Sequence, residues 1–371
     1  MKVALVHDVL NQLGGAEKVL ENFLEIWPDA TIHTVFYDEE KTKGVFAKYK
    51  KKISALDNFP FAHKHPKLFL PLIPFAFERF DFSEYDVVIS DSSAFAKFVK
   101  TNKLNICYCH TPTRFLWTEP GYIDTQRYPW ILKLLGKVIL PFIRKWDYRA
   151  AQRPDYMLAN SENVKSRIEK YYQRDSFVIP PPIDAEFYQP STTKKDYFLT
   201  VSRLEPYKKI DLIIKAFIKL NLPLKVAGTG TLLNVFKAIS GSNIEILGRV
   251  SDEELRNLYA QAKAFVFAAE EDAGITLLEA QAAGTPVIAY RAGGALEVVK
   301  EGVTGEFFNR QEITDIENAV KSFDSGKYNS QTVRANAMQF DKKNFQKQIR
   351  EFVEQKFAHQ KQMEESREVK L

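Results

Sequence analysis

Short apolar segments alternate with helix-like segments along almost the whole chain. The apolar runs, rich in β-branched and aromatic residues, begin near positions 2, 31, 52, 85, 105 and 156, and again near positions 197, 224, 244, 264 and 286. Most of them are apolar throughout, a pattern that is typical of parallel strands covered by helices on both faces. The pattern therefore predicts two α/β domains, each with a doubly wound parallel sheet.

A proline-rich segment separates the two series of strands. Residues 178–196 read VIPPPIDAEFYQPSTTKKD, and the three consecutive prolines and the polar stretch interrupt any regular element. We therefore predict an N-terminal domain at residues 1–185 and a C-terminal domain at residues 190–342, with a ligand cleft between them. A helix at residues 343–358 is expected to pack back on the N-terminal domain, and a charged tail at residues 359–371 is expected to follow it.

Composition describes an ordinary folded protein, because 45% of the 371 residues are hydrophobic and 27% are charged. The first residues, MKVALVHDV, are not expected to act as a secretory signal, and the longest apolar runs contain prolines and are too short to span a bilayer. Cys107 and Cys109 alternate along one apolar run, so they are poor disulfide partners and favour a reduced, cytoplasmic setting. A metal site on this pair would need further ligands.

Positive charge is concentrated in one part of the chain. The whole sequence has a formal net charge of +5, but residues 41–150 alone contain 19 Lys and Arg against 9 Asp and Glu. Such a one-sided basic region is suited to nucleic acid or to anionic lipid. The sequence contains no zinc, helix-turn-helix or RNP-like signature, so a nucleic-acid partner is not expected.

Two strand-to-helix turns carry groups that suit a phosphate. After the first predicted strand, Gly14 and Gly15 open a helix, where backbone N–H groups and the helix dipole favour an anion. After the first strand of the second series come Arg203, Lys208 and Lys209, three cations that suit a pyrophosphate. In the plainer interpretation, the glycines serve only helix entry and the cations are solvated loop charges.

Carboxylates gather where the predicted strand at residues 264–269 ends. Glu271 lies in this acidic turn, the residues from Gly274 to Thr276 then open a helix, and Glu279 follows about one helical turn further on. A carboxylate at Glu279 suits a vicinal diol such as ribose, and an acid in the turn suits the hydroxyls of a sugar. The helix N-terminus attracts a phosphate. The plainer interpretation is an acidic loop followed by ordinary helix-start charges.

At these residues the sequence resembles a known family. The segment EEDAGITLLEAQAAGTPVIAY resembles the EX7E signature of the GT4 family of retaining glycosyltransferases, with Glu271 and Glu279 as the two glutamates. SRLEPYKKID is similar to the phosphate site of that family, GGAEKVLE to its N-terminal glycine loop, and YCHTPTRFLW to its histidine strand. The four motifs occur in the family's order over most of the chain. The resemblance implies a hexosyltransferase with the GT-B fold, in which one Rossmann-like domain binds the acceptor and the second binds the donor.

The resemblance also implies roles for the residues that contact the donor's diphosphate and sugar. Arg203, Lys208 and Gly15 would contact the diphosphate, and Glu271 would contact the hydroxyls of the transferred sugar. Three consecutive residues would present backbone N–H groups beside that sugar: Gly274, Ile275 and Thr276.

The nucleoside end of the donor is matched by further residues of the second domain. Glu279 would hold the ribose hydroxyls, and the backbone at Arg249 and Val250 would meet the base. Two positions depart from the family pattern. Ala273 replaces a frequent phenylalanine, which puts the width of the donor pocket in doubt. Lys209 replaces a frequent glycine, which adds a charge near the phosphates or the solvent.

The resemblance places the reacting centre at His110 and Glu271, which are expected to act in catalysis. Gly14 and Arg114 are candidates for the acceptor side. The family transfers sugars with retention of the anomeric configuration. The sequence contains no Asp-X-Asp pair, which usually binds a divalent metal ion in the other large transferase fold. We therefore predict a metal-independent reaction without a cofactor.

The residues of the first glycine motif and of the histidine motif are most similar to those of family members that use GDP-mannose. Those members build O-antigen, lipopolysaccharide and other surface polysaccharides, so mannose transfer from GDP-mannose is the expected activity. A UDP-sugar donor is the alternative, because main-chain contacts to a base leave little trace in the side chains. A GT-B-like nucleotide-sugar epimerase would share the diphosphate site, but the EX7E arrangement with two cations fits transfer better. A sugar-binding protein without catalysis would not need two phosphate cations.

The N-terminal half indicates where the acceptor is held. Residues 130–146 read WILKLLGKVILPFIRKW, which places Lys133, Lys137 and Arg144 on one helical stripe beside a broad apolar remainder. With the basic excess, this segment would suit peripheral contact with an anionic membrane that carries a glycan or undecaprenyl-linked acceptor. We therefore expect a cytoplasmic protein, peripheral on the inner face of the cell membrane. The alternative is a buried helix with a few snorkelling lysines.

Overall fold

The computed structural model describes residues 1–60, 69–118 and 130–368, without the side chains of residues 131–133, 135–137, 367 and 368. The chain divides into two compact units. Unit 1 contains Met1–Pro180 and Phe345–Leu371, and unit 2 contains Pro181–Asn344. The cleft expected between the two units stays a prediction.

Unit 2 begins earlier in the chain than the sequence predicts. The N–H of Ile183 donates to the carbonyl oxygen of Phe340 at 3.0 Å, and the carbonyl oxygen of Ile183 accepts from the N–H of Lys342 at 2.9 Å. These bonds hold the end of the proline segment against the last part of unit 2, so the boundary falls at Pro181.

Within the described residues, unit 1 contains a parallel sheet of seven strands in the order β3-β2-β1-β4-β5-β6-β7. Its strands are β1 (Val3–His7), β2 (Thr31–Thr34), β3 (Lys51–Ile53), β4 (Val87–Ser92), β5 (Leu104–Cys109), β6 (Tyr156–Ala159) and β7 (Phe177–Val178). Its helices are α1 (Gly15–Ile26), η1 (Ala55–Asn58), α2 (Ile73–Glu78), η3 (Ala96–Phe98), α3 (Arg114–Trp117), α5 (Trp130–Ala150), α6 (Glu162–Tyr172) and α14 (Lys342–Glu368).

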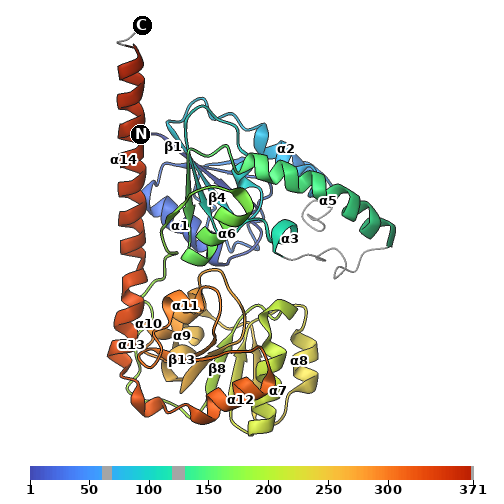
Figure 1. Ribbon diagram of the computed structural model, residues 1–371, viewed down its shortest axis with the longest axis vertical. Helices are drawn as coiled ribbons and strands as arrows, with labels where there is room; N and C mark the ends of the chain where they lie inside the picture. Colours follow the sequence, from blue (N-terminus) through green and yellow to red (C-terminus); the bar gives the residue numbers. More distant parts are fainter. Residues whose placement is uncertain (61–68, 119–129, 369–371) are drawn as a thin grey trace. The chain divides into compact units, whose positions relative to one another are not determined.

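Helices cover both faces of the unit 1 sheet (Figure 1). Successive side chains of β1 point to opposite faces, so Leu5 lies in one core and Val6 in the other. Phe23 of α1 and Phe345 of α14 stack with ring centroids 5.8 Å apart in the core of Leu5. Phe77 of α2 packs in the core of Val6.

Within the described residues, unit 2 contains a parallel sheet of six strands in the order β10-β9-β8-β11-β12-β13. Its strands are β8 (Phe198–Val201), β9 (Leu224–Ala227), β10 (Ile244–Gly248), β11 (Ala264–Phe267), β12 (Val287–Tyr290) and β13 (Gly305–Phe308). Its helices are η4 (Pro206–Lys208), α7 (Ile210–Leu220), α8 (Leu233–Ile239), α9 (Asp252–Gln261), α10 (Ile275–Ala282), α11 (Ala295–Val298), α12 (Ile313–Ser322), η5 (Ser325–Lys327), α13 (Ser330–Ala337) and η6 (Met338–Phe340).

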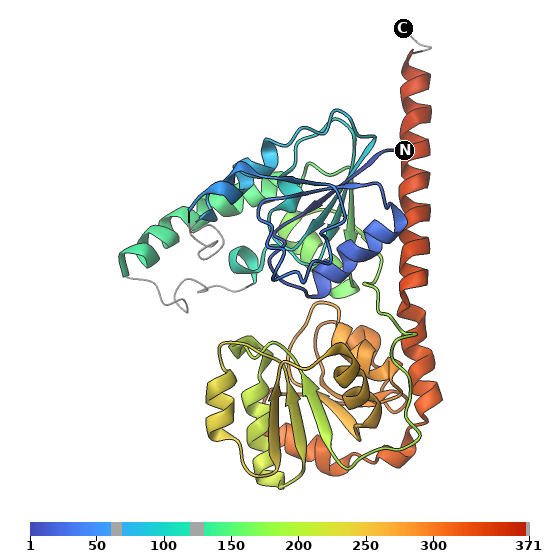
Figure 2. The ribbon, with the colours of Figure 1, turned by 180° about the vertical axis from the view of Figure 1, so that it is seen from behind.

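The unit 2 sheet is also covered on both faces (Figure 2). Val266 of β11 packs in a core with Phe217 of α7 and Ile316 of α12. Its neighbour Phe265 points the other way, into the core that contains Leu277 of α10. The prediction of two doubly wound parallel sheets is therefore confirmed.

The strands differ from the predicted runs in three places. The short strands β7 and β13 were not predicted, because β7 has two residues and β13, GEFF, lies between polar loops. The run predicted from residue 52 leaves the sheet at Ile53. There the hydroxyl of Ser54 accepts the N–H of Leu56 at 3.0 Å and starts a 3-10 turn.

The last helix is longer than the sequence predicts. α14 runs to Glu368, whereas the helix was expected to end at residue 358. Its packing on unit 1 includes Val353 and Phe357. The residues beyond contain Gln, Lys, Met and Glu but no Gly or Pro, so intrinsic propensity favours continuation of the helix. Among the described residues, no helix has the length and apolar character needed to cross a bilayer.

Candidate functional site

In each sheet the direction of winding reverses at one gap, here called the switch point. It lies between β1 and β4 in unit 1, and between β8 and β11 in unit 2. Ligands of open α/β sheets bind outside the carboxyl ends of the strands at such a gap, because the connections on its two sides run to opposite faces. Arg203 and Lys208 follow β8 and Glu271 follows β11, whereas His110 follows β5, the strand beside β4.

At the switch point of unit 2, Lys208 forms an ion pair with Glu271. The two side chains are only 12% and 23% exposed, so their attraction is less screened than that of a surface pair. The Nζ of Lys208 also lies 5.1 Å from the centroid of the Tyr207 ring. Arg203 precedes them on the same turn and is exposed. The structure thus brings the cation predicted for a diphosphate against the acid predicted for a sugar.

Two glycines let neighbouring loops pack directly on the backbone that carries these groups. Gly293 has φ of 59°, and a Cβ there would overlap the carbonyl oxygen of Glu271. The N–H of Gly294 donates to that same oxygen at 2.8 Å. Gly228, with φ of 135°, approaches the backbone beside Arg203 in the same way. Any larger residue at these positions would push the loops apart, so the glycines help to fix where Arg203 and Glu271 project.

The N-terminus of α10 follows Glu271 directly. Gly274 is the N-cap residue in a left-handed conformation, and within the described structure no side chain caps this helix. The first N–H groups of a helix have no intrahelical partner, and the helix dipole favours an anion or an oxygen-rich group beside them. Ile275 and Thr276 are half-buried at this end, whereas Ala273 is 7% exposed. The predicted N–H donors therefore lie next to the ion pair.

Glu279 lies near two tyrosines that the sequence did not predict. Its side chain is buried and accepts a hydrogen bond from the hydroxyl of Tyr259 at 3.2 Å. The second tyrosine is Tyr188, which is close enough for the Glu279 charge to raise the pKa of its phenol. Burial and then the Glu279 charge raise the pKa of both phenols, so both remain donors. A carboxylate has about four acceptor positions, so two phenols leave capacity for a ligand hydroxyl.

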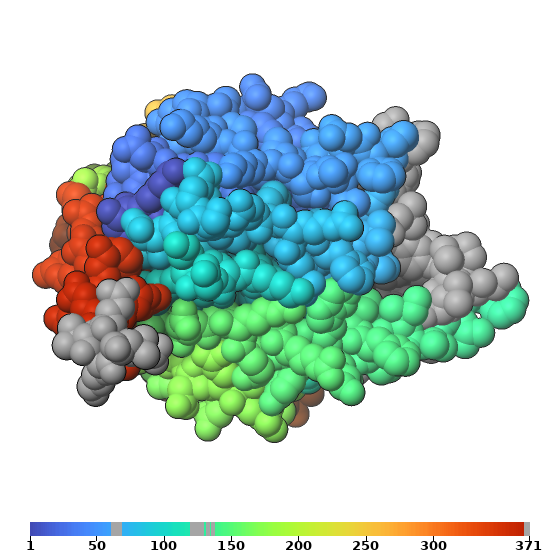
Figure 3. All heavy atoms as spheres, turned by 90° about the horizontal axis from the view of Figure 1, so that it is seen from above, coloured from blue at the N-terminus to red at the C-terminus, as the bar shows by residue number. Residues whose placement is uncertain are grey.

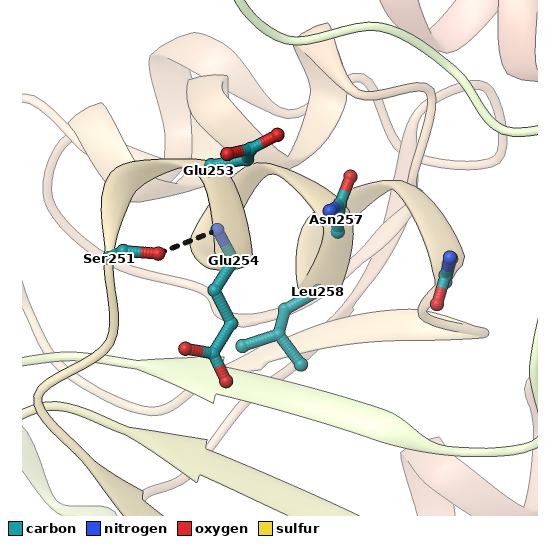
Figure 4. A pocket seen from close by; sticks show the side chains of 6 residues that line it. Ser251, Glu253, Glu254, Asn257 and Leu258 are labelled. Carbon is teal, nitrogen blue, oxygen red and sulfur yellow. Dashed lines mark hydrogen bonds between the residues drawn. The ribbon is translucent and has the colours of Figure 1, made fainter.

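Arg249 and Val250 follow β10 and lead into α9. Arg249 is exposed, and Val250 packs against the core. A hollow of about 360 Å³ lies beside α9 and is lined by Ser251, Glu253, Glu254, Asn257, Leu258 and Gln261. Figure 4 shows the Ser251 hydroxyl accepting the N–H of Glu254 at 3.1 Å, with the Glu254 and Leu258 side chains on one side of the helix. Two carboxylates border this hollow, so it does not suit a diphosphate.

At the switch point of unit 1, one carboxylate joins two histidines. Asp91 in β4 accepts hydrogen bonds from Nδ1 of His7 at 2.8 Å and from Nε2 of His110 at 2.5 Å. Asp91 and His7 are 1% and 2% exposed, and the His110 side chain is 12% exposed. The three residues come from the carboxyl ends of adjacent strands. Asp91 therefore orients the ring of His110, the predicted catalytic residue, from its buried side.

A second carboxylate lies on the far side of His7. Oε1 of Glu17, in the first turn of α1, is 3.7 Å from Nε2 of His7. Burial alone would lower the pKa of His7, but Asp91 and Glu17 outweigh it and raise the pKa to about 10. Burial would also raise the pKa of each carboxyl group, but the histidines lower it. His7 is therefore charged at neutral pH between two charged carboxylates.

Two further features of unit 1 shape this edge. Gly14 is the N-cap residue of α1 and Gly15 its first residue, as the sequence predicts. The carboxylate of Asp8 accepts the N–H groups of residues 93–96 at 2.6 to 2.8 Å. The loop after β4 is thereby fixed beside the end of β1.

Arg114 begins α3, shortly after His110, and is half-buried. No role was predicted from the sequence for His7, Asp91 or Glu17. A signal for the first two is present, because the apolar runs that form β1 and β4 end in the polar segments VHD and ISDS. Glu17 had no such signal, since a charge in the first turn of a helix is ordinary.

The described residues contain no group of three or more His, Cys, Asp or Glu side chains that could hold a metal ion. Cys107 and Cys109 are buried free thiols. Burial raises the pKa of Cys107 to about 11, so this thiol stays protonated and is a poor ligand.

Two family sequence models match the chain. One, described as Glycosyltransferase Family 4, matches residues 13–187, and the other, described as Glycosyl transferases group 1, matches residues 184–340. A GDP-mannose-dependent alpha-(1-6)-phosphatidylinositol monomannoside mannosyltransferase of Mycolicibacterium smegmatis is 26% identical over 218 residues, which cover 50% of this chain and 57% of that relative. The chain spans about half the length of the curated relatives it matches.

Solved structures share the fold. HepE of Anabaena, in complex with UDP and glucose, aligns with a TM-score of 0.69 at 18% identity, covering 95% of this chain and 99% of HepE. Sucrose-phosphate synthase of Thermosynechococcus elongatus aligns with a TM-score of 0.75 at 16% identity, covering 97% of this chain and 100% of that chain. At these identities the likeness shows the fold alone, and it confirms the predicted GT-B fold.

The charge of His7 predicts how stability depends on pH. The free energy of unfolding should fall as the pH rises from about 6.5 to about 10, by at most about 1.4 kcal/mol per pH unit, because folded His7 keeps a proton that the unfolded chain releases. His7→Gln removes this titration, so the variant should lose less stability over the same range. Asp91 and Glu17 stay ionised over this pH range, so they do not contribute to the change of the unfolding free energy with pH.

Urea unfolding at about pH 7 and about pH 9.5 measures the difference between the two proteins, and titrations common to both cancel. Equal pH dependence in the wild type and in His7→Gln would show that His7 is not charged in the folded state.

Proposed function

The chain belongs to the family 4 glycosyltransferases, and on that basis we propose that it transfers a hexose from a nucleotide-sugar donor. The observation that supports this most directly is the ion pair between Lys208 and Glu271 at the switch point of unit 2. A donor's diphosphate would replace Glu271 as the anion beside Lys208. Glu271 would then accept hydrogen bonds from hydroxyls of the sugar, so neither charge is left without a partner.

The chemistry requires stabilisation of a departing diphosphate. The bond between the anomeric carbon and the diphosphate oxygen breaks, positive charge develops on the sugar ring, and negative charge develops on the leaving group. Arg203, Lys208 and the N-terminus of α10 would stabilise that negative charge, and each well-placed donor is worth about 3 kcal/mol. Gly15 would lie near the same phosphates.

We propose that transfer retains the anomeric configuration. The acceptor hydroxyl forms a new bond to the anomeric carbon on the face that the diphosphate leaves, and its proton passes to an oxygen of the departing phosphate. This route needs no protein nucleophile. His110 would lie near the reacting carbon with its ring fixed through Nε2 by Asp91. Gly14 and Arg114 would face the acceptor.

The nucleoside would be held by the remaining predicted residues of unit 2. Glu279, which is hydrogen-bonded to Tyr259, would accept hydrogen bonds from the ribose diol. The backbone at Arg249 and Val250 would meet the base. Because main-chain contacts carry little information about the base, these residues alone do not choose between guanine and uracil.

Mannose from GDP-mannose is the donor we propose. The residues of the glycine and histidine motifs support this donor, and a GDP-mannose-dependent mannosyltransferase is among the relatives. A UDP-sugar is the second candidate, supported by the shared fold of HepE, whose structure contains UDP and glucose. The acceptor we propose is a glycan or lipid-linked glycan in the synthesis of a cell-surface polysaccharide.

A thermal-shift comparison of GDP, UDP and ADP tests the donor. At about 100 times its dissociation constant, the correct diphosphate should add about 2.7 kcal/mol to the stability of the folded protein and raise its midpoint by several degrees. GDP should give the largest shift, and guanosine should give little because the cations would have no anion to bind. A larger shift with UDP would reassign the base, and no shift with any diphosphate would remove the proposed donor site.

The proposed reaction needs no metal ion. With excess EDTA, the initial rate of sugar transfer should stay within about two-fold of the untreated rate, because protein cations rather than a divalent ion stabilise the leaving diphosphate. If EDTA abolished sugar transfer and added Mg²⁺ or Mn²⁺ restored it, the reaction would require a metal ion and this prediction would be wrong.

A further inference from the structure

A row of large apolar side chains lies exposed on α5 of unit 1. Trp130, Leu134, Val138 and Phe142 are 73%, 56%, 58% and 73% exposed. Their spacing of one helical turn puts neighbouring members of the row side by side. Isolated exposed apolar residues are ordinary, but a contiguous row of this size marks a contact surface. Figures 1 and 3 show this part of α5, coloured green, extending to the rim of unit 1.

The other side of α5 fixes the orientation of this row. Asp147 is fully buried and pairs with buried Lys97 at 2.7 Å. Trp146 packs on Phe98 with ring centroids 5.4 Å apart, and Nε of Arg144 donates to the carbonyl oxygen of Leu116 at 2.8 Å. The apolar row therefore cannot turn inward without breaking a buried ion pair.

One cation of the stripe predicted from the sequence also has contacts within its own unit. Arg144, predicted to lie on one helical stripe with Lys133 and Lys137, is exposed, and its guanidinium lies over the Trp117 ring. The side chains of Lys133 and Lys137 lie outside the described residues.

Two other cations continue the exposed face. Lys145 and Arg149 are exposed one turn and two turns beyond Phe142. Asp147 is the only acid in the sequence of α5, and it is buried. Among the side chains of α5 that the structure describes, the exposed ones thus change from apolar to cationic along the helix and include no carboxylate.

A second helix enlarges the apolar part of this surface. Phe75 of α2 is 52% exposed, and Leu72, which precedes the helix, is 47% exposed. The Phe75 ring lies 4.4 Å from the Trp146 ring of α5, centroid to centroid. The docking face, defined as the exposed side chains of α5 together with Leu72 and Phe75, therefore spans two packed helices.

We propose that this docking face binds an anionic lipid surface. Aromatic and aliphatic side chains on a helix that lies in the membrane plane enter the boundary of headgroups and acyl chains, while Lys145 and Arg149 contact headgroup phosphates. The absence of exposed acids on α5 favours a polyanionic partner over a second copy of this chain. The proposal rests on the proposed function for its purpose, because a lipid-linked acceptor would bring the enzyme to a membrane.

Co-sedimentation of the full chain with vesicles tests the docking face. Binding to phosphatidylcholine vesicles that contain phosphatidylglycerol should exceed binding to phosphatidylcholine alone, and added salt should weaken it. The double variant Lys145→Gln, Arg149→Gln should bind vesicles about five-fold more weakly for each cation removed. The double variant Trp130→Ser, Phe142→Ser should bind at least about ten-fold more weakly, because it removes two large apolar side chains from the face.

Matched substitutions on α8 of unit 2 serve as controls. Val235 is 49% exposed and Lys237 is exposed, so Val235→Ser with Lys237→Gln removes similar groups elsewhere and should leave vesicle binding unchanged. Equal binding to both vesicle types at low salt, or an equal effect of the α5 and α8 variants, would overturn the proposal.

Sedimentation velocity distinguishes the alternative occupant. A concentration-dependent dimer that the α5 substitutions abolish, without vesicle binding, would assign the face to a second copy of the chain and overturn lipid docking. The thermal shift of the same variants with nucleotide reports on the donor site of unit 2 and not on the docking face. A failure of lipid docking can therefore be distinguished from a failure of the proposed function.

Discussion

The ion pair between Lys208 and Glu271 is the interaction on which the rest of the donor site depends. Both charges are partly withdrawn from water at a switch point, so each needs an opposite or polar partner at all times. A nucleotide sugar supplies both partners in one molecule, an anion for the lysine and hydroxyls for the glutamate. The close glycine contacts beneath Glu271 and beside Arg203 then matter because they hold the two loops that carry these residues.

Unit 1 handles charge at its own switch point differently. Its row of Glu17, His7, Asp91 and His110 satisfies its charges internally, and only the His110 end has appreciable exposure. A buried charged row resists rearrangement, because removal of one member leaves its neighbour uncompensated. The two switch points therefore have different parts in the proposed reaction: unit 2 exchanges its partner for a ligand, and unit 1 presents one fixed imidazole.

Local patterns predicted much of this structure, and long-range contacts account for most of what they missed. Continuous apolar runs identified most of the strands, and polar residues at strand ends, together with the family motifs, located Arg203, Glu271 and His110. The sequence around Glu279 does not indicate that Tyr259 and Tyr188 lie close to it, because these residues are distant along the chain and approach Glu279 only after folding. The bond from Arg144 to Leu116 was not predicted for a related reason: helical spacing gives the angle of a side chain around the helix but not its partner on another helix.

The role of the two cations is tested by the turnover number for sugar transfer in Arg203→Ala and in Lys208→Ala, with Lys215→Ala as the control. Lys215 lies on α7 of the same unit and forms an exposed pair with Asp211. Arg203 is itself exposed, so its removal should leave folding intact. We expect the turnover number to fall by about 10²- to 10³-fold in Arg203→Ala and in Lys208→Ala, and to change little in the control. Undiminished turnover in both would contradict the assignment of these cations to the departing diphosphate.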